Sequence, residues 1–131
     1  MKIPINDVLS RDKTKNHNKR HGLFIYNLEP SYMSGSHWVA TFNNANKIEY
    51  FDSFGLNPYQ EMLNYAVNKN MTLVHQNQQI QNIESTRCGY YCLYFLNERN
   101  KGVSYFDLLQ VFDVNDTNKN EKIIEQYFKT I

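Results

Sequence analysis

Cys88 is the residue best placed in this sequence to act as a nucleophile. It lies between a polar segment, 82–87, and a strongly apolar segment that follows it. If the apolar segment forms a helix, Cys88 lies at its N-terminus, where free N–H groups and the helix dipole favour a thiolate. Gly89 would then let the backbone turn tightly and approach a substrate closely. The alternative is that Cys88 is a small buried apolar residue, which is the usual state of a free cysteine.

The second cysteine, Cys92, has a different expected role. It lies one turn further into the same predicted helix, and we interpret it as part of the hydrophobic core. A disulfide with Cys88 is not expected, because helix geometry does not suit a bridge between such close neighbours. A metal site would require further ligands at suitable spacing, and His17, His21 and His75 are too scattered to supply them. We therefore predict two free thiols and no metal.

A histidine and an aspartate could complete a site for nucleophilic catalysis. His37 begins one β-prone segment, and Asp52 directly follows the next one. The Asn-rich stretch 43–46 between the two segments predicts a β-hairpin, so that positions 37 and 52 lie at the same open end. The carboxylate could then hold the imidazole in the orientation that a general base requires. Taken alone, each residue also has an ordinary structural explanation, and Asp52 alone is better explained as a turn residue.

A side-chain amide is the fourth component that such a site would use. Gln81 lies shortly before Cys88 in the chain. An amide near the nucleophile can donate a hydrogen bond to a developing oxyanion, and loss of such a donor costs on the order of 100- to 1,000-fold in rate. Gln76, Gln78 and Gln79 lie in the same stretch, and spacing alone does not choose among the four. The alternative is an ordinary polar strand residue.

The hydrophobic pattern predicts the elements that must position these residues. We expect a short helical turn at 5–9, a loop at 10–20, strands at 22–28, 37–42, 47–51 and 71–75, and helices at 58–68, 88–99, 104–112 and 120–128. The segment 76–81 either continues the preceding strand or forms a new one. Together these elements predict an α+β fold, in which helices pack on a small central mixed β-sheet. A chain of 131 residues fits a single domain, 1–131.

Composition and charge exclude several classes of protein. The net charge is +1, with 14 basic and 13 acidic residues, whereas nucleic-acid binding usually shows as a basic excess. The basic residues between positions 11 and 20 are better explained by a solvated loop. No apolar stretch approaches 18 residues and the N-terminus lacks a secretory signal, so we expect a soluble intracellular protein.

The candidate residues together resemble one known family, the adenovirus-type (adenain-like) cysteine proteases. Their clan includes the proteases that process SUMO and other ubiquitin-like proteins. The chain order His, Asp, Gln, Cys is that of the family, and the likeness spans residues 6 to 128. Closer in pattern are the proteases of Maverick/Polinton elements, virophages and related DNA viruses. The matching pieces are Gly35-Ser36-His37-Trp38, Tyr50-Phe51-Asp52-Ser53-Phe54-Gly55, Ile80-Gln81 and Cys88-Gly89-Tyr90-Tyr91-Cys92-Leu93.

The resemblance implies an adenain-like fold and a role for each matching residue. Cys88 would be the nucleophile and its own N–H an oxyanion donor, with Trp38 and Gly89 contacting the substrate. The family cuts after small residues, often Gly-Gly, in viral structural precursors during virion maturation. The remaining catalytic roles would be base for His37, orienting acid for Asp52 and oxyanion donor for Gln81.

The resemblance also bears on cofactors, partners and location. Adenain is stimulated by DNA and by a peptide that it holds through a disulfide, but here the only spare cysteine, Cys92, lies in the Cys88 helix. We therefore expect no cofactor and no requirement for nucleic acid, while an activating peptide or protein stays unidentified. The expected partners are polypeptide substrates, with no membrane, and the chain is expected to be a monomer. The expected location is the host cell (virus factory, cytoplasm or nucleus) and the virion.

Two alternatives remain at this stage. One is a deconjugating protease for ubiquitin-like proteins, because that clan shares Gly-Gly recognition. The other is a non-catalytic module that keeps the fold for interactions.

Overall fold

The computed structural model describes residues 2–29 and 37–129 and is built on a five-stranded mixed β-sheet. The strands follow the order β1-β2-β3-β4-β5, with β2, β3 and β4 antiparallel and the outer strands β1 and β5 added in parallel. This confirms the predicted α+β class with a mixed central sheet. The strands are β1 (Asp7–Ser10), β2 (His21–Asn27), β3 (Trp38–Asn44), β4 (Lys47–Phe51) and β5 (Thr72–His75).

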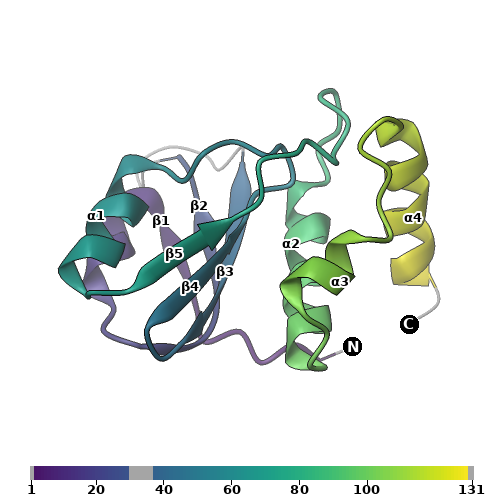
Figure 1. Cartoon of the computed structure of the whole chain (residues 1–131). Helices are drawn as coiled ribbons and strands as arrows, with labels where there is room; N and C mark the ends of the chain where they lie inside the picture. Colours follow the sequence, from purple (N-terminus) through teal and green to yellow (C-terminus); the bar gives the residue numbers. More distant parts are fainter. Residues whose placement is uncertain (1, 30–36, 130–131) are drawn as a thin grey trace.

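Helices cover both faces of the sheet, as Figure 1 shows, with α1 on one side and α2, α3 and α4 on the other. The side chains of β2 alternate between the two resulting cores: Leu23 and Ile25 enter one, and Phe24 and Tyr26 enter the other. A strand buried on both faces reads as a continuous apolar run, which is the pattern of 23–26. The helices are η1 (a 3₁₀ helix, Arg11–Asn16), α1 (Gln60–Asn68), α2 (Cys88–Asn100), α3 (Tyr105–Leu109) and α4 (Thr117–Lys129).

The predicted hairpin is present and fixes the ends of two strands. Strands β3 and β4 pair from Ala40 opposite Phe51 to Asn44 opposite Lys47, so only residues 45 and 46 form the turn. Ala45 adopts a left-handed φ of 58° there. The short turn sets the register, and in consequence the residue before β3 and the residue after β4 lie at the same end of the sheet.

The structure corrects the prediction near the N-terminus. Residues 5–9 were expected to form a helical turn, but Asp7–Ser10 form strand β1, in which Val8 pairs with Ile25. A helical turn this short is unstable by itself, whereas pairing with β2 satisfies the backbone groups. The predicted loop 10–20 also contains η1.

Two further differences concern the second half of the chain. The segment 76–81 is neither a continuation of β5 nor a new strand, because Ile80 and Gln81 both donate their backbone N–H groups to one carbonyl, that of Ser53. Helix α3 begins after Ser104, whose hydroxyl accepts from the N–H of Asp107 as predicted, but it ends at Leu109. The predicted loop containing Gly35 and Ser36 lies outside the described residues. No helix in the described part of the chain is long and apolar enough to span a membrane.

Candidate active site

The structure brings Cys88 and His37 into contact from distant parts of the chain. Cys88 is the first residue of α2, as predicted, and its thiol lies close enough to the His37 side chain for each group to shift the pKa of the other. Helix α2 packs on β3, and His37 lies immediately before that strand. The backbone N–H groups of Trp38 and Gly89 also bond to the sulfur. The thiol therefore lies at a helix N-terminus, surrounded by donors that stabilise its negative form.

Asp52 holds the imidazole from the other side. Its Oδ1 atom lies 3.0 Å from His37 Nε2 and accepts a second hydrogen bond, of 2.8 Å, from the N–H of Phe54. The carboxylate is 1% exposed. The Phe54 ring packs against the imidazole with 4.9 Å between ring centroids. Because Nε2 bonds to Asp52, Nδ1 is the ring nitrogen that could exchange a proton with Cys88, and it is buried with no hydrogen-bond partner of its own among the described residues.

The pKa values of the pair shift in opposite directions. Burial by itself would lower the pKa of His37, but its interactions with Asp52 and Cys88 outweigh burial and raise the pKa to about 9. Burial would raise the pKa of Cys88, but the interaction with His37, including its charge, and the hydrogen bond from the Trp38 N–H lower it below the ordinary thiol value. The two shifts favour a thiolate–imidazolium pair near neutral pH.

The turn that follows β4 keeps Asp52 in place. The N–H of Gly55 donates to the Asp52 carbonyl, and Gly55 has a left-handed φ of 71°. A Cβ atom added to Gly55 would lie 2.5 Å from the carbonyl carbon of Gln78, so only glycine fits both the conformation and the space.

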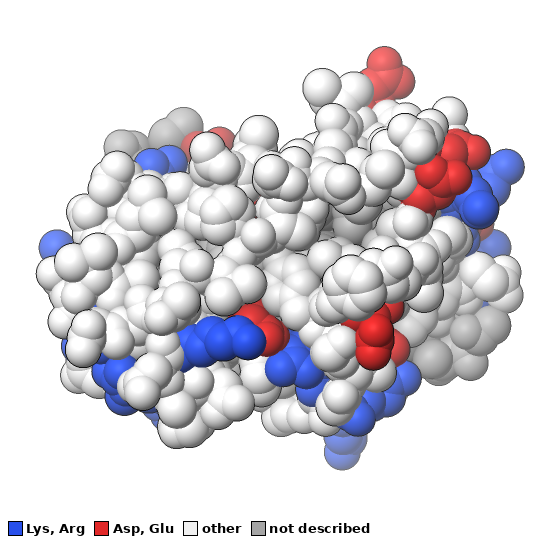
Figure 2. All heavy atoms as spheres, viewed as in Figure 1, with Lys and Arg blue, Asp and Glu red and all other residues white. Residues whose placement is uncertain are grey.

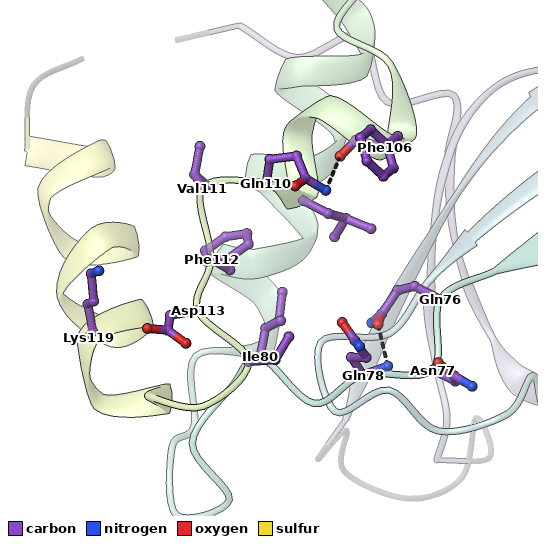
Figure 3. Close-up of a pocket in the computed structure, with 12 residues that line it drawn as sticks. Gln76, Asn77, Gln78, Ile80, Phe106, Gln110, Val111, Phe112, Asp113 and Lys119 are labelled. Atoms are coloured by element: carbon purple, nitrogen blue, oxygen red, sulfur yellow. Dashed lines mark hydrogen bonds between the residues drawn. The ribbon is translucent and has the colours of Figure 1, made fainter.

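A glutamine supports the same carbonyl from the neighbouring segment. Gln76 Nε2 donates to the Asp52 carbonyl at 2.7 Å, and the Gln76 Oε1 atom accepts from the N–H of Gln78 at 2.5 Å. Figure 3 shows this second bond beside Ile80, at the wall of a cavity of about 600 Å³. The Gln76 amide thus replaces the strand pairing that ends at His75.

Gln81 is distinguished from its three neighbouring rivals by burial. Gln78 and Gln79 are exposed and Gln76 supports Asp52, whereas Gln81 is 0% exposed. Its amide is bonded to Ser53, the residue after Asp52, and to Ser85 in the segment before Cys88. It therefore lies between the two segments that carry the acid and the thiol, and a role toward an oxyanion stays a prediction.

Trp38 and Gly89, which follow His37 and Cys88 in the chain, line a second cavity. This cavity measures about 400 Å³ and is mainly apolar. Gly89 lies inside α2 and has no left-handed φ, so the expectation that it is needed for a tight turn is wrong. A Cβ atom added there would meet nothing within 4 Å, which means that the backbone of Gly89 faces open space. The cavity is lined by Val8, Ile25, Trp38, Thr86, Gly89, Tyr90 and Leu93.

Cys92 is part of the core, as interpreted from the sequence. It is 0% exposed, and burial raises the pKa of its thiol well above the ordinary value. Among the described residues, no group of three or more His, Cys, Asp or Glu side chains could hold a metal ion. The contributions of Ser53 and Gln76 could not be predicted from the sequence, because their partners lie 28 and 24 residues away in the chain.

Among solved structures, the fold is similar to that of a viral protease. Two structures of a protease from African swine fever virus (ASFV) match with TM-scores of 0.54 and 0.59, at 24% and 19% sequence identity. They cover 72% and 80% of this chain, which spans 40% and 53% of theirs, about half their length. A likeness at this identity shows that the fold is shared.

The other comparisons give no match on which a conclusion about this chain is based. A structure of the SUMO protease Ulp1 matches with a TM-score of 0.42 at 16% identity, covering 66% of this chain and 47% of Ulp1, and we base no conclusion on it. No protein-family model matches the sequence, and no curated protein matches it.

Iodoacetamide should alkylate Cys88 and spare Cys92 in the folded protein. At pH 6.5 an ordinary thiol is only about 1% thiolate, so the lowered pKa of Cys88 should increase its alkylation rate by about 10-fold or more. His37→Ala removes the imidazole that lowers this pKa and should return the rate at pH 6.5 toward that of a free thiol. Mass spectrometry of the labelled protein measures both rates. Equal labelling of the two cysteines, or an unchanged rate in His37→Ala, would contradict the assignment.

Proposed function

We propose that this chain is a cysteine endopeptidase, with Cys88 as nucleophile, His37 as base, Asp52 as orienting acid and Gln81 as oxyanion donor. The observation that carries the proposal is the continuous contact from thiol to imidazole to buried carboxylate. The comparison with the ASFV protease shows a shared fold and does not test the chemistry, so the assignment of chemistry depends on these side chains. An intact arrangement of this kind argues against a non-catalytic interaction module.

The proposed reaction uses each group in turn. The Cys88 thiolate attacks the peptide carbonyl carbon, and the carbonyl oxygen becomes an oxyanion that the Cys88 N–H and Gln81 stabilise. His37 then gives its Nδ1 proton to the leaving amine as the C–N bond breaks, which leaves an acyl-enzyme thioester. Neutral His37 next accepts a proton from water as the water oxygen attacks the thioester carbonyl, and the C–S bond then breaks, which releases the acid and regenerates the Cys88 thiolate beside the imidazolium. Asp52 keeps the imidazole oriented throughout.

The proposed substrates are viral structural precursors cut after glycine, at Gly-Gly-X-like sites, during virion maturation. Support comes from the motif resemblance and from the fold shared with a viral protease. The cavity lined by Trp38 and Gly89 adds a physical reason, because the uncovered backbone of Gly89, the residue after Cys88, leaves room for a close approach. A residue with no side chain at the scissile carbonyl fits such a site. This function would place the protein in the infected cell, in the virus factory, cytoplasm or nucleus, and in the virion.

Surface charge supports a protease that does not require nucleic acid. Figure 2 shows basic and acidic side chains mixed on one face, mainly along its lower and right parts, and a broad uncharged area across its upper middle. The whole chain carries a charge of only +1. We propose that residues 1–131 act as one protease domain and as a monomer on polypeptide substrates, away from membranes.

A library of Gly-Gly-X peptides should be cleaved by this chain and left intact by Cys88→Ala. The products, identified by mass spectrometry, should end in glycine at the new C-terminus. Asp52→Asn is a second comparison: it should reduce kcat by about 1,000-fold or more while the protein stays folded, because the imidazole loses its orienting charge. Cleavage by Cys88→Ala at the same sites would show a contaminating protease or a different nucleophile, and silence of the parent on every peptide would contradict the proposal.

Gly89→Val should hinder the binding of peptide substrates without changing the reactivity of the Cys88 thiol. The added side chain projects into the open space beside the thiol, so kcat/KM for glycine-ended sites should fall by about 10-fold or more through steric exclusion. Alkylation of Cys88 by iodoacetamide should change little, since that reagent is small. Val111→Ala, which changes an exposed residue elsewhere, is the control. Unchanged peptide cleavage in Gly89→Val would show that substrates do not pass this position.

A further inference from the structure

Two buried side chains, Ser53 and Gln81, and the partly buried Ser85 form a hydrogen-bonded chain between the segments that carry Asp52 and Cys88. The Ser53 hydroxyl donates to Gln81 Oε1 at 2.5 Å. Gln81 Nε2 donates to the Ser85 carbonyl at 3.0 Å and lies 3.2 Å from the Ser85 hydroxyl oxygen. Ser53 and Gln81 are both 0% exposed. Water therefore cannot replace the bond between Ser53 and Gln81, and each of these two side chains depends on the other.

The partners of Gln81 fix which way its amide points. A backbone carbonyl can only accept a hydrogen bond, so the Gln81 nitrogen must face the carbonyl of Ser85. The oxygen of the amide then faces Ser53, whose hydroxyl is free to rotate and donate. The two Ser85 oxygens belong to one residue and can share a single amide hydrogen. The second hydrogen of the Gln81 amide is then available for another acceptor.

We propose that Ser53 is a positioning residue, which holds the Gln81 amide so that its second hydrogen is presented to the oxyanion. This inference rests on the proposed function for its catalytic meaning and on the hydrogen bonds for its geometry. It gives the Asp52-Ser53 pair two linked tasks: Asp52 orients the base and Ser53 orients the oxyanion donor. The two catalytic groups are thereby fixed by neighbouring residues of a single buried turn.

Ser53→Ala removes this hydroxyl without removing the rest of the turn. The Ser53 carbonyl accepts from the N–H groups of Ile80 and Gln81 at 2.9 and 3.0 Å, and both bonds survive the substitution. The backbone of the segment should therefore stay where it is, while the amide of Gln81 loses the donor that fixes its oxygen. The variant isolates the orientation of one amide.

The first measurement is kinetic and uses a Gly-Gly-X peptide that the parent cleaves. Ser53→Ala should reduce kcat by about 10-fold, less than the 100- to 1,000-fold expected for loss of the donor itself, with KM changed by less than about twofold. Alkylation of Cys88 by iodoacetamide should be unchanged, because that displacement forms no oxyanion. A fall in alkylation that matches the fall in kcat would mean that the thiol and not the amide was disturbed, and would overturn the proposal.

A double-mutant cycle shows whether Ser53 acts through Gln81. Ser53→Ala should cause no further loss of kcat in a Gln81→Ala background, because the group that it positions is absent. If the losses of kcat caused by the two single substitutions instead multiply in the double variant, the proposal is overturned. Thr14→Val is the matched control: Thr14 is also 0% exposed and its hydroxyl lies 2.5 Å from the Tyr59 hydroxyl, in the core on the opposite face of the sheet. It should lower the melting temperature as Ser53→Ala does and leave kcat unchanged.

An NMR measurement tests the geometry without any activity. The two Nε2 protons of Gln81 should give well-separated, slowly exchanging signals in the parent, and these should shift and broaden in Ser53→Ala but not in Thr14→Val. Unaltered signals in Ser53→Ala would overturn the proposal whatever the kinetics show. If the parent cleaves no peptide, the proposed function fails and Ser53 has no oxyanion donor to position, whereas the NMR result still decides whether it holds the amide.

Discussion

The hydrogen bond between His37 and Asp52 is the contact on which the rest of the site depends. It joins the ends of two adjacent strands and uses the Nε2 atom of the ring, so that the other nitrogen faces the thiol. The geometry follows from the hairpin, because a two-residue turn fixes the register of β3 and β4 and hence the positions of their outer ends. Helix α2 then needs only to pack against β3 to bring Cys88 to the ring.

Burying the charged imidazole of His37 is unfavourable, and its contact with Asp52 offsets this cost. A buried charge is unfavourable unless it is paired, and here the imidazolium lies between a buried carboxylate and the thiolate. The pKa of His37 is about 9 in the folded chain and 6.5 when unperturbed, so its stabilising contribution is complete below pH 6.5 and lost as pH rises through 9. The lowered pKa of Cys88 has the opposite sign, and its contribution is lost as pH falls through that lowered value. The charged pair is therefore favoured at pH values between the lowered pKa of Cys88 and the raised pKa of His37.

The sequence predicted the parts of this arrangement that depend on local pattern. Strand β2, the hairpin and helix α2 each follow from a run of apolar residues and its boundary, and they carry His37, Asp52 and Cys88 to one place. Contacts between distant segments could not be predicted. No periodicity relates Ser53 to Gln81, and β1 exists only because β2 offers it a partner. Burial, which separates Gln81 from the other glutamines, is also a property of the whole fold.

The most direct test of this account is an NMR titration of the His37 ring nitrogens, in the parent and in Cys88→Ala. We predict that His37 keeps both ring protons at pH 7 and titrates near pH 9 in the parent. In Cys88→Ala it should titrate at a lower pH, because the thiolate that stabilises the imidazolium is gone. Titration of the parent ring at pH 6.5 or below, or the same midpoint in both proteins, would contradict the thiolate–imidazolium pair and with it the proposed mechanism.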